Sequence, residues 1–156
     1  MAIVITINVS TVVVHLKQRV STRFSMAIHI LSMIAVKHTE QTGDEIARSV
    51  NNNPVVIRRV IGMLKRAGIM DVRAGVGGAF LLKTPEEITL LEIYRAVNEI
   101  EENDLYAFRI HEDSNVGCPV GRNIESVLHS EFAKAQAAME NQLGSTTLSQ
   151  LIPRFI

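Results

Sequence analysis

The sequence has little cysteine, no tryptophan and few aromatic residues. Cys118 is the only cysteine among 156 residues. One thiol excludes an intramolecular disulfide and any metal site built entirely from the cysteines of one chain. No apolar run reaches the roughly 18 residues that a membrane-spanning helix needs. We therefore expect a cytoplasmic protein that does not enter a membrane.

The chain also lacks a net charge, but its charges are unevenly distributed. Residues 20–83 contain nine Lys/Arg and four Asp/Glu, a net charge of +5. Residues 84–156 contain five Lys/Arg and twelve Asp/Glu, a net charge of −7, and Lys17 and Arg19 supply the remaining positive charges. The first segment could meet phosphate groups while the second avoids them. A neutral total therefore does not exclude nucleic-acid binding.

Residues 1–19 alternate apolar and polar side chains with the period of a strand. Their positive charges, Lys17 and Arg19, follow the apolar part, whereas a signal peptide carries its charge first. Two interpretations remain. These residues form an additional strand, or the sequence is extended too far at its N-terminus and translation begins near Val20. We favour the second because the domain pattern begins abruptly at Ser21.

A helix-turn-helix pattern begins at Thr42. Thr42 and Glu45 form a capping box for a short helix. Asn53 as N-cap and Pro54 at the first helical position begin a second helix, which ends at Gly68. The predicted inward stripe of the second helix consists of Val56, Val60, Met63, Leu64 and Ala67. Because its basic residues lie mostly outside that stripe, the pair is typical of a DNA-binding helix-turn-helix.

A β-hairpin is predicted directly after the second helix. Residues 71–73 and 79–83 are strand-like, and Gly75, Gly77 and Gly78 lie between them. A phosphate-binding glycine loop is the alternative, but such a loop opens onto a helix rather than a strand. The hairpin occupies the place of the wing in a winged helix-turn-helix protein.

The remaining pattern is helical. Further helices are predicted over residues 21–38, 90–99 and 120–143 and from Leu148 onward, with capping boxes at Thr89/Glu92 and Thr147/Gln150. A helix as long as 120–143 has little to pack on in so small a domain, so we expect it to pair with a second copy. The predicted fold is mainly α with a small hairpin wing. It divides into a winged helix-turn-helix domain (20–99) and a segment of linker and dimerisation helices (100–156).

With these motifs, the chain resembles the Rrf-two family of bacterial winged helix-turn-helix transcriptional regulators. The resemblance covers about Ser21 to Leu151. Its most specific parts are the run 64–69, the Gly-Gly wing ending in Phe80-Leu81-Leu82, and Thr147-Leu148. The resemblance implies a homodimer paired through the long helix, a recognition helix from Pro54 to Ala67, and a wing in the minor groove.

The sequence departs from the family pattern at two places. Ala74 stands where family wings usually carry an arginine, and Arg73 lies one residue earlier. Cluster-binding members carry three closely spaced cysteines, whereas this chain has Cys118 alone and Ser126 near the position of the last. We therefore expect no iron–sulfur cluster and no other cofactor.

The predicted function is sequence-specific transcriptional regulation, as a repressor that binds a palindromic operator as a homodimer. Val55 could contact a thymine methyl group, and Arg58 could bind guanine O6 and N7. The predicted DNA-binding residues are Asn53, Val55, Arg58, Arg59, Lys65, Arg66, Arg73 and Lys83. The alternative is a protein-interaction module whose basic helix binds an acidic partner.

Two ways of controlling such a regulator are compatible with the sequence. Cys118, near the predicted subunit contact, could be oxidised or pair with its counterpart, or it could be a small buried apolar residue. A small effector could also bind in a pocket between the domain and the long helix.

Other chemistry has little support in the sequence. No nucleophile–base pair can be identified, so we predict no enzyme. His111, Glu112, Asp113 and Cys118 fit no standard metal-site spacing, and no metal site is predicted. His29 is expected in the core.

Overall fold

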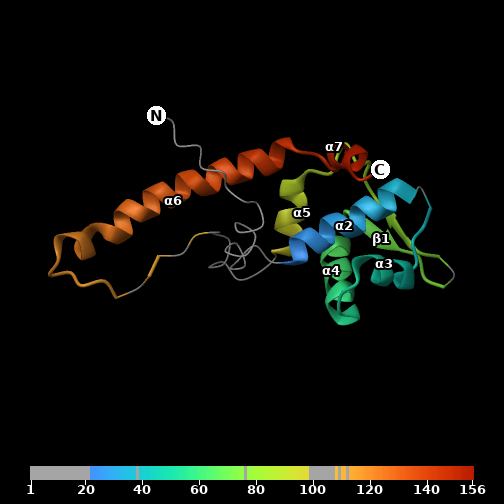
Figure 1. The fold of residues 1–156 in the computed structure, drawn as a ribbon, viewed down its shortest axis with the longest axis horizontal. Helices are drawn as coiled ribbons and strands as arrows, with labels where there is room; N and C mark the ends of the chain where they lie inside the picture. Colours follow the sequence, from blue (N-terminus) through green and yellow to red (C-terminus); the bar gives the residue numbers. More distant parts are fainter. Residues whose placement is uncertain (1–21, 38, 76, 99–107, 109, 112) are drawn as a thin grey trace, which may run out of the picture.

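The computed structural model describes residues 22–37, 39–75, 77–98, 108, 110–111 and 113–156. The elements in chain order are α2 (Thr22–Lys37), α3 (Gly43–Val50), α4 (Pro54–Arg66), β1 (Met70–Val72), β2 (Ala79–Leu81), α5 (Leu90–Val97), α6 (Pro119–Ser145), α7 (Leu148–Leu151) and the 3-10 helix η1 (Ile152–Arg154). Helix α6 extends away from the group formed by α2 to α5, and α7 lies back beside that group (Figure 1). The mainly helical fold with a hairpin is confirmed. Both interpretations of residues 1–19 lie outside the described residues.

Helix α2 is the centre of the core. It packs against α3, α4, α5, β2 and α7. Its broad apolar face explains this, because six of its apolar side chains are buried: Met26, Ala27, Ile30, Leu31, Ile34 and Ala35. The prediction that His29 lies in the core is wrong. His29 is exposed at the edge of this face, and its Nε2 lies 2.9 Å from Ser49 Oγ on α3.

The caps of the helix-turn-helix form as predicted. The Glu45 N–H donates to Thr42 Oγ1 (3.3 Å), and the Thr42 N–H donates to Glu45 Oε2 (2.8 Å). Asn51 ends α3 with φ 49°, and Gly68, with φ 71°, follows α4. A left-handed residue at each point lets the chain leave its helix and turn.

The inward face of α4 differs partly from its prediction. Val60, Met63 and Leu64 are buried as expected, whereas Ala67 is exposed. Ile57 is buried with 2% exposure and takes the place expected of Val56, which is only partly buried. Because positions 55 to 57 are all apolar and β-branched, the pattern alone did not distinguish which of them faces inward.

The hairpin pairs Met70 with Leu81 and Val72 with Ala79, so both strands are shifted or shorter than predicted. Gln41 pairs with Ala79 on the other side, through an Ala79 N–H bond to the Gln41 carbonyl (2.7 Å) and the reciprocal bond (3.1 Å). The wing is therefore held to the segment between α2 and α3 as well as to itself.

The second half of the chain departs from two local predictions. At α5, Thr89 Oγ1 accepts the Glu92 N–H (3.1 Å), but the Glu92 carboxylate binds Lys83 instead of completing a capping box. Helix α6 begins one residue earlier than predicted and continues through Gly144 to Ser145. Gly144 does not end the helix. A glycine within a helix lowers the stability of the helix but does not have to end it.

Helix α7 rejoins the domain. The Leu148 N–H donates to the Ile88 carbonyl (2.8 Å), and the Leu148 side chain is fully buried in the core. Helix α6, by contrast, packs mainly on α5 and leaves Val120 and Val127 more than half exposed. Among the helices built from described residues, none combines the length and apolar character needed to cross a membrane.

Candidate nucleic-acid interface

The start of α4 is an exposed corner of the helix-turn-helix. Asn53 is exposed, and its Oδ1 accepts the Val55 N–H (2.9 Å), which fixes the first turn. The Val55 side chain is 64% exposed although it is apolar. An exposed valine at a helix start can contact a base methyl group, and the positive end of the helix dipole favours a phosphate nearby.

Arg58 and Arg59 follow on the outward face of α4. Both are exposed, while their neighbours Ile57 and Val60 are buried. Neither guanidinium forms an ion pair with another residue that the structure describes. Both arginines can therefore bind an anion without first losing an intramolecular partner.

Two more basic residues lie in the last turn of α4. Lys65 Nζ lies 3.0 Å from Asp71 Oδ1 on β1, and both side chains are more than two-fifths exposed. The Val72 N–H, and then Lys65, lower the pKa of Asp71, which therefore stays ionised. Arg66 is also exposed. Lys65 thus connects the end of α4 to the wing, and a phosphate would have to compete with Asp71 for it.

Arg73 directly follows β1, where the hairpin loop begins, and is held from two sides. Its Nη1 lies 2.8 Å from Glu40 Oε1, and its guanidinium carbon lies 5.1 Å from the Phe80 ring centroid. The other Glu40 oxygen accepts the Gly78 N–H (3.2 Å). The side chain is still 66% exposed, so it can face a nucleic acid while remaining attached to the wing.

Lys83 is oriented differently from the other predicted residues. Its ammonium group binds the Glu92 carboxylate of α5, a contact outside the helix-turn-helix and the hairpin. The structure thus brings Asn53, Val55, Arg58 and Arg59 together on the first half of α4. Lys65 and Arg66 lie at its other end, and Arg73 lies on the wing.

Sequence reasoning missed Glu40 and Gln41, which place the wing. They lie more than thirty positions before their partners Arg73, Gly78 and Ala79. No local motif indicates such a contact, because it depends on the path of the chain between α2 and α3. The only signal in the sequence was an acidic residue, Glu40, just before the capping box of Thr42.

Cys118 is exposed as the N-cap of α6, not buried as the alternative prediction had it. The backbone N–H groups of Gly121 and Val120 lower the pKa of its thiol. A helix N-terminus stabilises a thiolate, which is the reactive form. Glu112 lies outside the described residues, and the rest of the described chain brings together no three His, Cys, Asp or Glu side chains suited to a metal.

Comparison with known proteins agrees with this geometry. Residues 20–154 match the Rrf2 (Rrf-two) family, described as "Iron-dependent Transcriptional regulator". The chain belongs to the Rrf2 family. It is 48% identical over 134 residues to a protein of Bacillus subtilis (strain 168), "Putative HTH-type transcriptional regulator YwnA", covering 85% of this chain and 96% of that one. Family and relative are regulators, not enzymes, so this protein is a DNA-binding transcriptional regulator.

Solved structures show the same fold. A crystal structure of a "putative DNA binding protein" is 43% identical, with a TM-score of 0.65, and covers 83% of this chain and 98% of that one. The cysteine regulator CymR of B. subtilis is 22% identical, with a TM-score of 0.63, and covers 86% and 96%. IscR of T. potens is 19% identical, with a TM-score of 0.66, and covers 91% of each chain. These last two likenesses concern the winged-helix fold alone.

An iron–sulfur cluster held by cysteines does not fit the ligands that this chain offers. Iron–sulfur clusters are held mainly by cysteine thiolates, typically four. Each chain offers only Cys118, so even two paired chains would supply half of that number. The thiol is also exposed at a helix start rather than enclosed by further donors.

Proposed function

We propose that this protein binds a palindromic operator as a homodimer and represses the adjacent gene in the bacterial cytoplasm. The observation that carries the proposal is the outward face of α4. There Arg58 and Arg59 are exposed and unpaired with other described residues, next to exposed Val55. Phosphate neutralisation would supply affinity, and base contacts at the helix start would supply specificity.

The dimer would form through the helix predicted at 120–143, which is α6. This helix extends from the domain (Figure 1), and its exposed apolar side chains include Val120 and Val127. A second copy could cover them and place two α4 helices about one DNA turn apart, roughly 34 Å. Repression would then follow from occupation of the operator.

The first prediction concerns Arg58. Replacing Arg58 by alanine should weaken operator binding by about 1–3 kcal/mol and relax specificity at one base pair of each half-site. Fluorescence anisotropy against an operator selected from genomic fragments, at several salt concentrations, measures both effects and the number of chains per duplex. Lys134→Ala is the control, because Lys134 is an exposed basic residue outside the helix-turn-helix, and among the described residues its ion pair is with Glu131 on α6.

Three results would contradict the proposal: unchanged operator affinity in Arg58→Ala, one chain per duplex, or no DNA binding at moderate salt. If DNA binding is absent while an acidic protein partner binds α4, the protein-interaction alternative replaces it. Lys83→Ala is a useful companion variant. Its ammonium group already binds Glu92, so a loss of affinity there would identify a DNA contact that the geometry does not favour.

The second prediction concerns oxidation of Cys118. Its exposed thiol has a lowered pKa, so peroxide should convert the thiolate to a sulfenic acid with release of hydroxide. If this event controls binding, peroxide should change operator affinity about fivefold or more in the wild type. The Cys118→Ser variant should not respond. Identical responses of both proteins, measured by anisotropy before and after peroxide and after reduction, would exclude a sensor role.

A further inference from the structure

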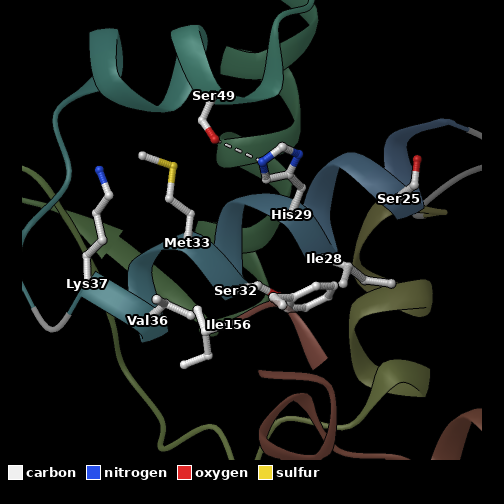
Figure 2. Close-up of a pocket in the computed structure, with 10 residues that line it drawn as sticks. Ser25, Ile28, His29, Ser32, Met33, Val36, Lys37, Ser49 and Ile156 are labelled. Carbon is white, nitrogen blue, oxygen red and sulfur yellow. Dashed lines mark hydrogen bonds between the residues drawn. The ribbon is translucent and has the colours of Figure 1, made fainter. Parts of the chain in front are cut away.

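A groove of about 530 Å³ runs along one face of α2, between α3 and the end of the chain. Figure 2 shows its two edges: His29, Met33 and Lys37 on the side of α3, and Val36 and Ile156 on the other side. This is not the predicted location, because an effector pocket was expected between the domain and the long helix. The volume falls in the range of small-molecule sites.

The shape of the groove favours an elongated ligand. Its α2 residues follow helical spacing from Ser25 to Lys37, a length of roughly 18 Å. The wall is mostly apolar and includes Ile28, Val36 and Phe155. Phe155 is 57% exposed, which leaves a large aromatic surface uncovered. A hydrocarbon chain lying along α2 would cover these side chains.

The edge nearest α3 is polar and basic. Lys37 is exposed and forms no ion pair with another described residue. Just over two helical turns before Lys37, His29 Nε2 shares a 2.9 Å hydrogen bond with Ser49 Oγ. The Thr42 hydrogen bonds, and to a lesser degree Lys37, lower the pKa of Glu45, and its carboxylate is occupied by the capping bonds to Thr42. Lys37 can therefore receive an anionic group.

Ser32 gives an independent indication of a ligand. It lines the groove with only 5% of its surface exposed, and its Oγ makes no hydrogen bond to any described residue. Buried hydroxyl groups almost always have a partner, and leaving one unpaired costs free energy. A polar atom of a bound molecule would supply that partner.

We propose that this groove binds a small amphipathic carboxylate with an extended hydrocarbon chain. Lys37 supplies the positive charge, Ser32 a buried hydrogen-bonding group, and Ile28, Val36 and Phe155 the apolar surface. This inference rests on the proposed function, because the ligand would act as the effector that controls operator binding. Ser49 lies two residues before Asn51, whose left-handed conformation begins the turn into α4. A ligand that competes for the His29–Ser49 bond would therefore act on the placement of α4.

Displacement of a fluorescent probe tests the site on the full chain without DNA. Anilinonaphthalene sulfonate is both apolar and anionic, and it should be displaced by decanoate more readily than by decanol. Lys37→Gln should weaken decanoate about threefold to fivefold and leave decanol unchanged. Ser32→Ala should also weaken decanoate, and the control Lys134→Gln should alter neither. No probe binding, equal displacement by acid and alcohol, or no effect of Lys37→Gln would each overturn the site.

A second measurement tests the link to DNA. Decanoate should change operator affinity, and operator DNA should change decanoate affinity by the same factor. If lysine-dependent displacement is found without any such change, the groove is not an effector site. If the chain binds no DNA but displacement is intact, the DNA-binding proposal fails and the ligand site stands. Operator binding without probe binding contradicts the groove alone.

Discussion

Replacing Leu148 by alanine should lower the free energy of unfolding by about 2–5 kcal/mol. Leu148 is fully buried, although it comes after the long helix, and it belongs to the same core as Ile88 and Ile93. Alanine would remove most of the side chain and leave a cavity that the surrounding helices can fill only partly. Urea unfolding monitored by circular dichroism measures the change.

The matched control is Leu82→Ala. Leu82 follows β2 with half of its side chain exposed, so its loss should cost less than about 1 kcal/mol. If both variants lose the same stability, or Leu148→Ala loses less, α7 does not pack as described. The expected result would show that Leu148 anchors the end of α6 to the domain core, beside Ile88. A dimer built on α6 would then be connected rigidly to the domain that carries α4.

Local chemistry explains which parts of the fold could be predicted. The helix caps act on backbone groups within a few residues, so the sequence alone predicts where these helices begin and end. The caps are Thr42 with Glu45, Asn53 with Pro54, and Gly68. These signals delimit the helix-turn-helix to within one or two residues. Arg58 was predicted outside the apolar stripe of this helix, and it is exposed beside buried Ile57.

Contacts between distant segments could not be predicted. Lys83 is drawn to Glu92, and Arg73 to Glu40, by chain paths that no periodicity encodes. The same limit applies to His29. Helical spacing places it at the edge of the apolar face, but its exposure and its contact with Ser49 on α3 depend on how α3 packs beside α2. The groove along α2 is likewise formed by three segments far apart in sequence.

The placement of the wing depends on a glycine, and its replacement gives the second large prediction. A Cβ at position 78 would lie 2.5 Å from the Gln41 carbonyl oxygen and 2.6 Å from its carbon, both backbone atoms. Neither atom can rotate away, so the hairpin would have to separate from Gln41. Gly78→Ala should therefore cost about 3 kcal/mol of stability, near the upper end for overpacking.

A glycine in α4 provides a control with the opposite sign. At Gly62 the nearest atom to an added Cβ is Arg66 Nη1, at 3.7 Å, an ordinary contact. Because alanine is the better helix former, Gly62→Ala should gain about 0.5–1 kcal/mol from the same chemical change. Urea unfolding of both variants decides the matter, since equal or greater stability of Gly78→Ala would show that Gln41 does not hold the wing. Displacing the hairpin also moves Arg73 and the Gly78 N–H away from Glu40, so Gly78→Ala should weaken operator binding while Gly62→Ala retains it.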